Sequence, residues 1–136
     1  MTDAFALDPR LAADTIALLD FDLCTLRLMN DRQFPWLILV PQRANLREIH
    51  DLSESDQPKL LAEILRTTRA LQRLLTPVKL NVAALGNSVA QLHVHVIARF
   101  TTDPAWPKPV WGVVAPIPYG EPEAIALRVR LEKALK

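Results

Sequence analysis

The stretch AQLHVHVIARF, residues 90–100, alternates polar and apolar side chains over most of its length. A period of two is typical of a β-strand whose two faces differ in character. One face would carry the apolar side chains Leu92, Val94 and Val96. The opposite face would carry the polar side chains Gln91, His93 and His95. The stretch therefore predicts a strand that packs on a core with one face and presents a histidine pair on the other.

The segments around this strand predict further strands and two amphipathic helices. Leucines recur at helical spacing through residues 51–75, and WLILVP is a continuous apolar run of the kind found in buried strands. Residues 31–33 are expected to form a hairpin turn and residues 86–87 a second turn. The expected elements are a short helix or turn at 8–15, strands at 24–30, 36–41, 78–85 and 90–100, and helices at 51–75 and 121–136.

This order of elements favours an α+β fold, with an antiparallel sheet of about five strands and flanking helices. The 136 residues are enough for one domain, expected to span 1–136. Its C-terminal part, from about 101 to 136, is an extension rich in proline and tryptophan. Residues 101–122 hold six of the eleven prolines, which predicts an extended loop that covers the sheet.

Composition excludes several classes of partner. The formal net charge is +1, so neither nucleic acid nor a membrane surface is expected as a partner. No stretch is long and apolar enough to span a membrane, and the first residues do not resemble a signal peptide. We therefore expect a cytoplasmic protein. The single cysteine, Cys24, is expected to be a small apolar core residue rather than a nucleophile.

The pair His93 and His95 has three interpretations from sequence alone. Side chains two apart on a strand stand roughly 6 to 7 Å apart on one face, so both rings can reach one small group. The rings could be satisfied structural residues, or metal ligands, or a nucleophile with a neighbouring hydrogen-bond donor. A metal needs a third ligand, and the one other histidine, His50, precedes a helix. Neutral imidazole is a good nucleophile toward phosphorus, and its ordinary pKa near 6.5 keeps it mostly neutral in the cell.

Residues 91–97, QLHVHVI, resemble the motif of the histidine-triad (HIT) family, in which three histidines alternate with apolar residues. Six of the seven positions match, and Gln91 stands where the first histidine is expected. The resemblance covers roughly residues 20–100. Other positions that follow the family pattern are Asn30, Pro35, Pro41, Asn81, Gly86, Asn87, Ser88 and Val89.

The resemblance implies an activity and a role for each of these residues. His93 would attack the α-phosphate of a nucleotide conjugate to form a nucleotidyl-histidine, and His95 would donate a hydrogen bond to the phosphate. The backbone carbonyl of Gln91 would orient the His93 ring. The substrate-binding residues implied are Asn81 and Ser88 at the phosphate, Asn30 at the ribose and Leu28 at the base. The family needs neither metal nor cofactor, and its members commonly form homodimers.

Two departures from the family pattern keep a second function open. Gln91 replaces a histidine, and Trp36-Leu37 stands where many relatives have Gly-His or Thr-His. The first hypothesis is a hydrolase of phosphoramidates or dinucleoside polyphosphates. The alternative is a nucleotide-binding module with little or no catalysis, because the altered triad would stabilise the transition state too weakly.

Three residues near the C-terminal extension have alternative roles at this stage. Trp106 and Trp111 could anchor the proline-rich loop, cover the nucleotide pocket or pack against a second subunit. Arg99 could steer phosphate or simply be solvated.

Overall fold

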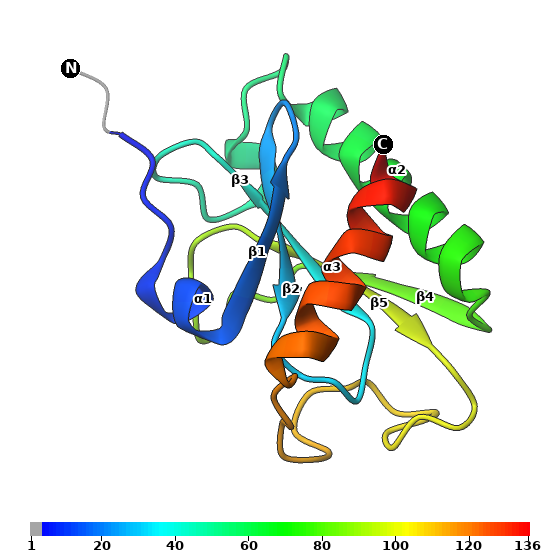
Figure 1. Ribbon diagram of the computed structural model, residues 1–136. Coiled ribbons are helices and arrows are strands. Elements are labelled where there is room, and N and C mark those ends of the chain that lie inside the picture. Colours follow the sequence, from blue (N-terminus) through cyan, green and yellow to red (C-terminus); the bar gives the residue numbers. More distant parts are fainter. Residues whose placement is uncertain (1–3) are drawn as a thin grey trace.

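The structure is a computed structural model, and it describes residues 4–136. It is an α+β fold with an antiparallel five-stranded sheet and flanking helices, as predicted, and the order of the strands in the sheet is β1-β2-β3-β5-β4 (Figure 1). The first three residues of the expected 1–136 domain lie outside the described residues. The elements are α1 (Pro9–Asp14), β1 (Thr15–Asp20), β2 (Cys24–Met29), β3 (Trp36–Pro41), a 3-10 helix (Ile49–Asp51), α2 (Gln57–Leu75), β4 (Lys79–Ala83), β5 (Val94–Arg99) and α3 (Glu121–Leu135).

The strands differ from the prediction mainly at β1 and at the start of β5. The sequence predicts no strand at Thr15–Asp20, yet β1 pairs with β2 along that stretch. The register shifts between Ala17 and Leu19, and this irregularity breaks the alternation that would have marked the strand. The histidine-bearing strand was expected from residue 90, but β5 begins at Val94, so His93 lies just before the strand.

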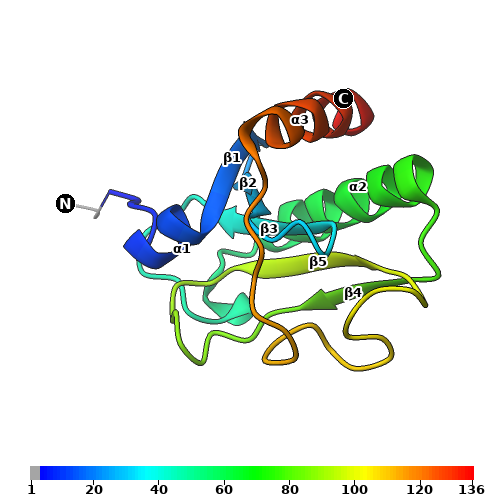
Figure 2. The same cartoon turned by 60° about the horizontal axis from the view of Figure 1, so that its bottom comes forward.

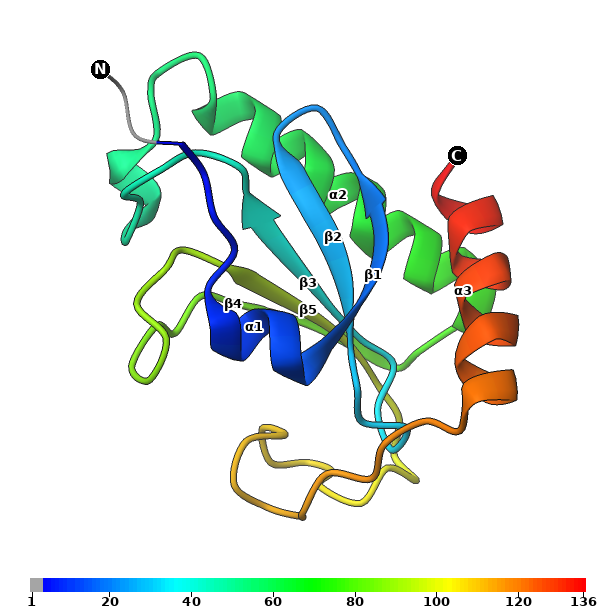
Figure 3. The same cartoon turned by 60° about the vertical axis from the view of Figure 1, so that its left-hand side comes forward.

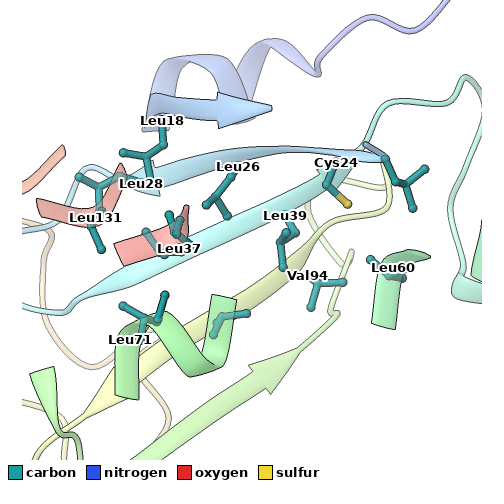
Figure 4. Close-up of a cluster of buried hydrophobic side chains, with 14 of the residues drawn as sticks. Leu18, Cys24, Leu26, Leu28, Leu37, Leu39, Leu60, Leu71, Val94 and Leu131 are labelled. Atoms are coloured by element: carbon teal, nitrogen blue, oxygen red, sulfur yellow. The ribbon is translucent and has the colours of Figure 1, made fainter. Parts of the chain in front are cut away.

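The helices α2 and α3 cover one face of the sheet, as Figure 2 shows. Apolar residues of the strands meet the helices in a large core, drawn in Figure 4, where Leu26, Leu37 and Val94 lie with Leu71 of α2. Cys24 belongs to this core and is fully buried, and burial raises the pKa of its thiol far above the ordinary value. Cys24 is therefore a core residue, as predicted.

The opposite face of the sheet is covered by the proline-rich segment that follows β5, which Figure 3 shows running to the start of α3. Phe34, Trp36, Ile38 and Ile97 form a second core there with Ala105 and Val110 of this segment, which is the covering loop that the prolines predicted. Because His95 pairs with Ile38 in the β3–β5 ladder, its side chain emerges on this same face.

Arg99 anchors the covering loop and is neither solvated nor free for phosphate, so both alternatives left open for it are wrong. Its side chain is buried and forms an ion pair with Asp103 at 2.9 Å. The guanidinium also donates to the Lys108 carbonyl at 2.7 Å and lies 5.6 Å from the ring centre of Trp106. Trp106 is thereby an anchor of the loop. Among residues 4–136, no helix is long and apolar enough to cross a lipid bilayer.

Candidate active site

His93 and His95 lie side by side in a closed environment. Their ring centres are 4.9 Å apart with the rings nearly perpendicular, and the two residues are 6% and 4% exposed. Because little water reaches the pair, hydrogen bonds to the two rings are strong. The partner of each ring nitrogen therefore decides whether that nitrogen carries a proton.

The Gln91 carbonyl fixes the protonation of His93. Nδ1 of His93 lies 2.7 Å from that carbonyl oxygen. A carbonyl only accepts hydrogen bonds, so Nδ1 must carry the proton. In the neutral ring the lone pair is then on Nε2, which is the nitrogen left to act as nucleophile. The contact is the one the family resemblance implied for the first triad position.

His95 is held in the opposite tautomer by a residue whose role the sequence analysis missed. The indole Nε1 of Trp36 donates to Nδ1 of His95 at 3.0 Å. Indole nitrogen only donates, so Nδ1 of His95 is unprotonated and the neutral ring carries its proton on Nε2. Burial, together with the charge of His93, lowers the pKa of His95 to about 4. His95 is therefore a neutral hydrogen-bond donor at physiological pH.

The side chain of Gln91 points away from this chemistry and holds the N-terminal segment. Its Oε1 accepts from the Asp8 amide at 2.8 Å, and its Nε2 donates to the Ala6 carbonyl at 2.9 Å. The side-chain amide thus satisfies two backbone groups of one extended segment. Gln91 therefore has two roles, because its backbone carbonyl orients the His93 ring and its side chain binds the backbone of the N-terminal segment.

A hollow of about 440 Å³ is lined by Trp36 and Trp111, the two indoles that contact His95. Trp111 is part of its wall, and the Trp111 ring centre is 5.0 Å from that of His95. Asn30 also lines the hollow, and its Oδ1 accepts from the Tyr119 amide at 2.9 Å. The volume lies within the range of small-molecule sites. The full lining is Ala13, Asp14, Met29, Asn30, Asp31, Trp36, Val110, Trp111, Gly112, Val114, Pro116 and Pro118.

A smaller hollow of about 190 Å³ lies on the side of His93. It is more polar in character, with Arg47 and His50 in its wall together with Gly86 of the turn before β5. His93 lines the smaller hollow directly, whereas the larger hollow adjoins the pair through Trp36 and Trp111, whose rings contact His95. The side chain of His50 is 83% exposed and contributes to this rim rather than to the pair.

Asn81 and Ser88, the residues implied for the phosphate, lie in different surroundings. Asn81 faces the same side of the sheet as the histidines, and its Oδ1 accepts from Arg99 at 2.9 Å. Ser88 is exposed in the turn before the pair, where its carbonyl accepts from Arg10 at 3.4 Å.

The placement of Leu28 corrects the expectation that it borders the base pocket. Leu28 is fully buried in the core between the sheet and the helices, as Figure 4 shows, so it lies on the wrong face. Its neighbour Met29 lines the larger hollow instead. Consecutive residues of a strand point to opposite faces, so an error of one position moves a side chain from the site to the core.

The described residues 4–136 contain no group of three or more His, Cys, Asp or Glu side chains that could hold a metal ion. The two imidazoles each use one nitrogen on a protein partner, and those partners are a carbonyl and an indole. The arrangement can therefore bind and attack an electrophile through the remaining Nε2 atoms.

Comparison with known proteins identifies the family of this chain. The HIT domain family matches residues 10–102, and the chain belongs to this family. A histidine triad protein from Bradyrhizobium japonicum is 45% identical, with a TM-score of 0.96 over 98% of this chain and 100% of that one. One from Sinorhizobium meliloti is 46% identical, with a TM-score of 0.93 over 96% of each chain.

A third histidine triad protein, from Marinobacter aquaeolei, is 45% identical, with a TM-score of 0.95 over 98% of this chain and 97% of that one. No protein of curated function matches the sequence. Membership of the HIT family points to nucleotide binding or to nucleotide hydrolase and transferase chemistry.

Proposed function

We propose that the protein hydrolyses a nucleotide conjugate, of the phosphoramidate or dinucleoside polyphosphate type, through a nucleotidyl-histidine intermediate on His93. The observation that carries the proposal is the pair of opposite tautomers 4.9 Å apart, an unprotonated Nε2 on His93 and an Nε2–H on His95. A nucleophile and a neutral donor side by side suit attack on a phosphoryl group whose oxygens gain charge.

The reaction has two displacements at phosphorus. The Nε2 lone pair of His93 forms a bond to the α-phosphorus, and the bond to the leaving group breaks with its electron pair. The leaving amine or phosphate takes a proton from solvent. Water then attacks phosphorus, the P–N bond returns its electrons to His93, and the water's proton goes to solvent. His95 donates to a phosphate oxygen in both steps.

The larger hollow is the proposed nucleoside site. Aromatic walls from Trp36 and Trp111 suit a purine or pyrimidine ring, and Asn30 stands at the rim with its amide nitrogen available for ribose oxygens. Ser88 and Asn81 are proposed for the phosphate. Gln91 takes the first triad position through its backbone carbonyl. On this view Trp111 is part of the nucleoside pocket rather than a loop anchor.

An activity panel tests the proposal. Adenosine phosphoramidate and diadenosine polyphosphate are incubated with the wild type and with His93→Ala, while circular dichroism checks that the variant folds. We expect turnover in the wild type and a loss of about 10³-fold or more in His93→Ala. His50→Ala is the matched control, since it removes an exposed imidazole outside the pair, and it should keep measurable turnover.

The alternative, a nucleotide-binding module, predicts a different pattern. Calorimetry would detect binding of adenosine monophosphate, and no leaving group in the panel would be released. Turnover that survives in His93→Ala would remove the mechanism altogether.

We further propose that the protein is a cytoplasmic homodimer. Within residues 4–136 the strand β4 lies at the edge of the sheet, and Val82 on it and Val78 just before it are 47% and 58% exposed. An open edge with apolar side chains is suited to pairing with another chain. Light scattering after size exclusion should give twice the 15.3 kDa chain mass, and a monomer across the micromolar range would contradict this.

A further inference from the structure

Trp36 lies beside His95 and can determine which nitrogen of that ring carries the proton. It is the first residue of β3 and pairs with Ile97 of β5, which places it on the histidine face of the sheet. Its side chain is buried, and its indole N–H reaches Nδ1 of His95 at 3.0 Å. Without this donor, the buried Nδ1 lone pair would lose its hydrogen-bond partner, which is costly in a dry site.

The rings around Trp36 fix where its N–H points. Its ring centre lies 6.3 Å from that of Phe34 and 5.8 Å from that of Trp111, and both pairs are close to perpendicular. Trp111 also touches His95, at 5.0 Å between ring centres, but donates no hydrogen bond to it in the described structure. The indole is therefore wedged between two aromatic side chains, and its direction is set by packing.

We propose that Trp36 is a positioning residue that holds His95 in the Nε2–H tautomer, aimed at the phosphate of the substrate. The inference rests on the proposed function, because it gives His95 the role of phosphate donor. A histidine in place of Trp36 could lose its donor proton or change its charge near neutral pH. An indole N–H does neither, so the donor to His95 remains in place whatever the pH.

The two histidines differ in tautomer because their Nδ1 atoms have hydrogen-bond partners of opposite kind. The Gln91 carbonyl accepts a hydrogen bond from Nδ1 of His93, so Nε2 of that neutral ring is unprotonated. The Trp36 indole donates to Nδ1 of His95, so Nε2 of that ring carries the proton. Exchanging either partner for a group of the opposite kind would reverse the tautomer and with it the role. The hydrogen-bond partner on Nδ1 of each ring, the Gln91 carbonyl for His93 and the Trp36 indole for His95, therefore decides which histidine is the nucleophile and which is the donor.

Nitrogen-15 NMR of the histidine side chains in the ligand-free protein is the test. In the wild type we expect His95 to have a proton on Nε2 and none on Nδ1 from pH 8 down to pH 5. In Trp36→Phe, which keeps the ring and removes the donor, His95 should show both tautomers and a pKa raised toward its ordinary value. His93 is the titratable neighbour whose charge acts on His95, so it is followed in the same spectra.

Kinetics and two further variants complete the test. Losing one buried hydrogen bond to His95 should lower kcat about tenfold in Trp36→Phe, with KM changed by less than about threefold. Trp36→His, which returns a ring N–H, should recover part of kcat. Trp111→Phe is the matched control for the spectra, since it alters the other aromatic contact of His95 and should leave the Nε2–H tautomer in place.

A proton on Nδ1 of His95 in the wild type would overturn the proposal, and so would an unchanged tautomer and pKa in Trp36→Phe. If that variant does not fold, the wild-type spectrum and Trp36→His still decide the question. The spectra need no substrate, so a failure of the proposed hydrolase activity would show in the turnover panel and leave this result standing.

Discussion

Asp103→Asn should destabilise the protein strongly, because it breaks the ion pair that fastens the covering loop to the sheet. Asp103 and Arg99 have side chains 3% and 2% exposed and meet at 2.9 Å. The carboxylate also accepts from the backbone amides of Phe100, Ala105 and Trp106. Asparagine has one acceptor oxygen in place of two and leaves the Arg99 charge uncompensated.

Removing one partner of a buried ion pair costs about 3 to 5 kcal/mol. Total stabilities of 5 to 15 kcal/mol are usual, so this is a large fraction. At roughly 3 to 4 °C per kcal/mol for a chain of this size, the Tm should fall by about 10 to 20 °C. Since the loop carries Trp111 into the larger hollow, nucleotide binding should weaken as well.

Urea titration and thermal melting followed by circular dichroism measure the loss. Asp22→Asn is the matched control, because the Asp22 carboxylate is 76% exposed in its 3.3 Å pair with Lys59. An exposed pair contributes less than about 1 kcal/mol. A loss of stability in Asp103→Asn no larger than in this control would show that the Arg99–Asp103 ion pair does not hold the loop.

Three further predictions concern the site and the core. Gln91→His, which restores the family's first histidine, should lower stability by about 1 to 3 kcal/mol in urea titration, because both hydrogen bonds to the N-terminal segment are lost, and kcat should not rise. His95 takes up a proton near pH 6.5 in the unfolded chain, whereas burial lowers its pKa to about 4 in the folded protein. As the pH falls from 6.5 to 4, protonation therefore favours the unfolded chain, and the free energy of unfolding should decrease by up to about 3 kcal/mol. Urea titrations of the wild type and His95→Asn across that range measure it, and equal slopes would contradict it. Cys24 should resist alkylation until the protein unfolds, since its thiol is fully buried with a raised pKa, and labelling of native protein followed by mass spectrometry would reveal the opposite.

The sequence predicted the elements with strong periodicity and missed the irregular one. The strand at residues 36–41 and the helix ending at Leu75 follow from apolar runs and leucine spacing, and both are present. The helix begins at Gln57 rather than at residue 51, because a 3-10 turn and a bend come first. The strand β1 contains a register shift, so its side-chain pattern resembles neither a regular strand nor a helix.

The site was predictable in part for the same reason. The pair His93 and His95 stands out through its spacing alone, and the carbonyl contact to His93 spans two residues. By contrast, Trp36 and His95 are 59 positions apart, and Gln91 reaches residues 83 and 85 positions away. Contacts of this kind depend on tertiary packing, and no local pattern in a single sequence encodes them.

Intact-mass spectrometry after rapid quenching, without acid, would detect the nucleotidyl-histidine intermediate on His93 directly. The wild type and His93→Ala are each mixed with adenosine phosphoramidate and sampled at short times. We expect a transient mass increase of one nucleotidyl unit in the wild type and none in the variant. A wild-type protein that binds the nucleotide but shows neither adduct nor released nucleotide, or an adduct that persists in His93→Ala, would contradict it.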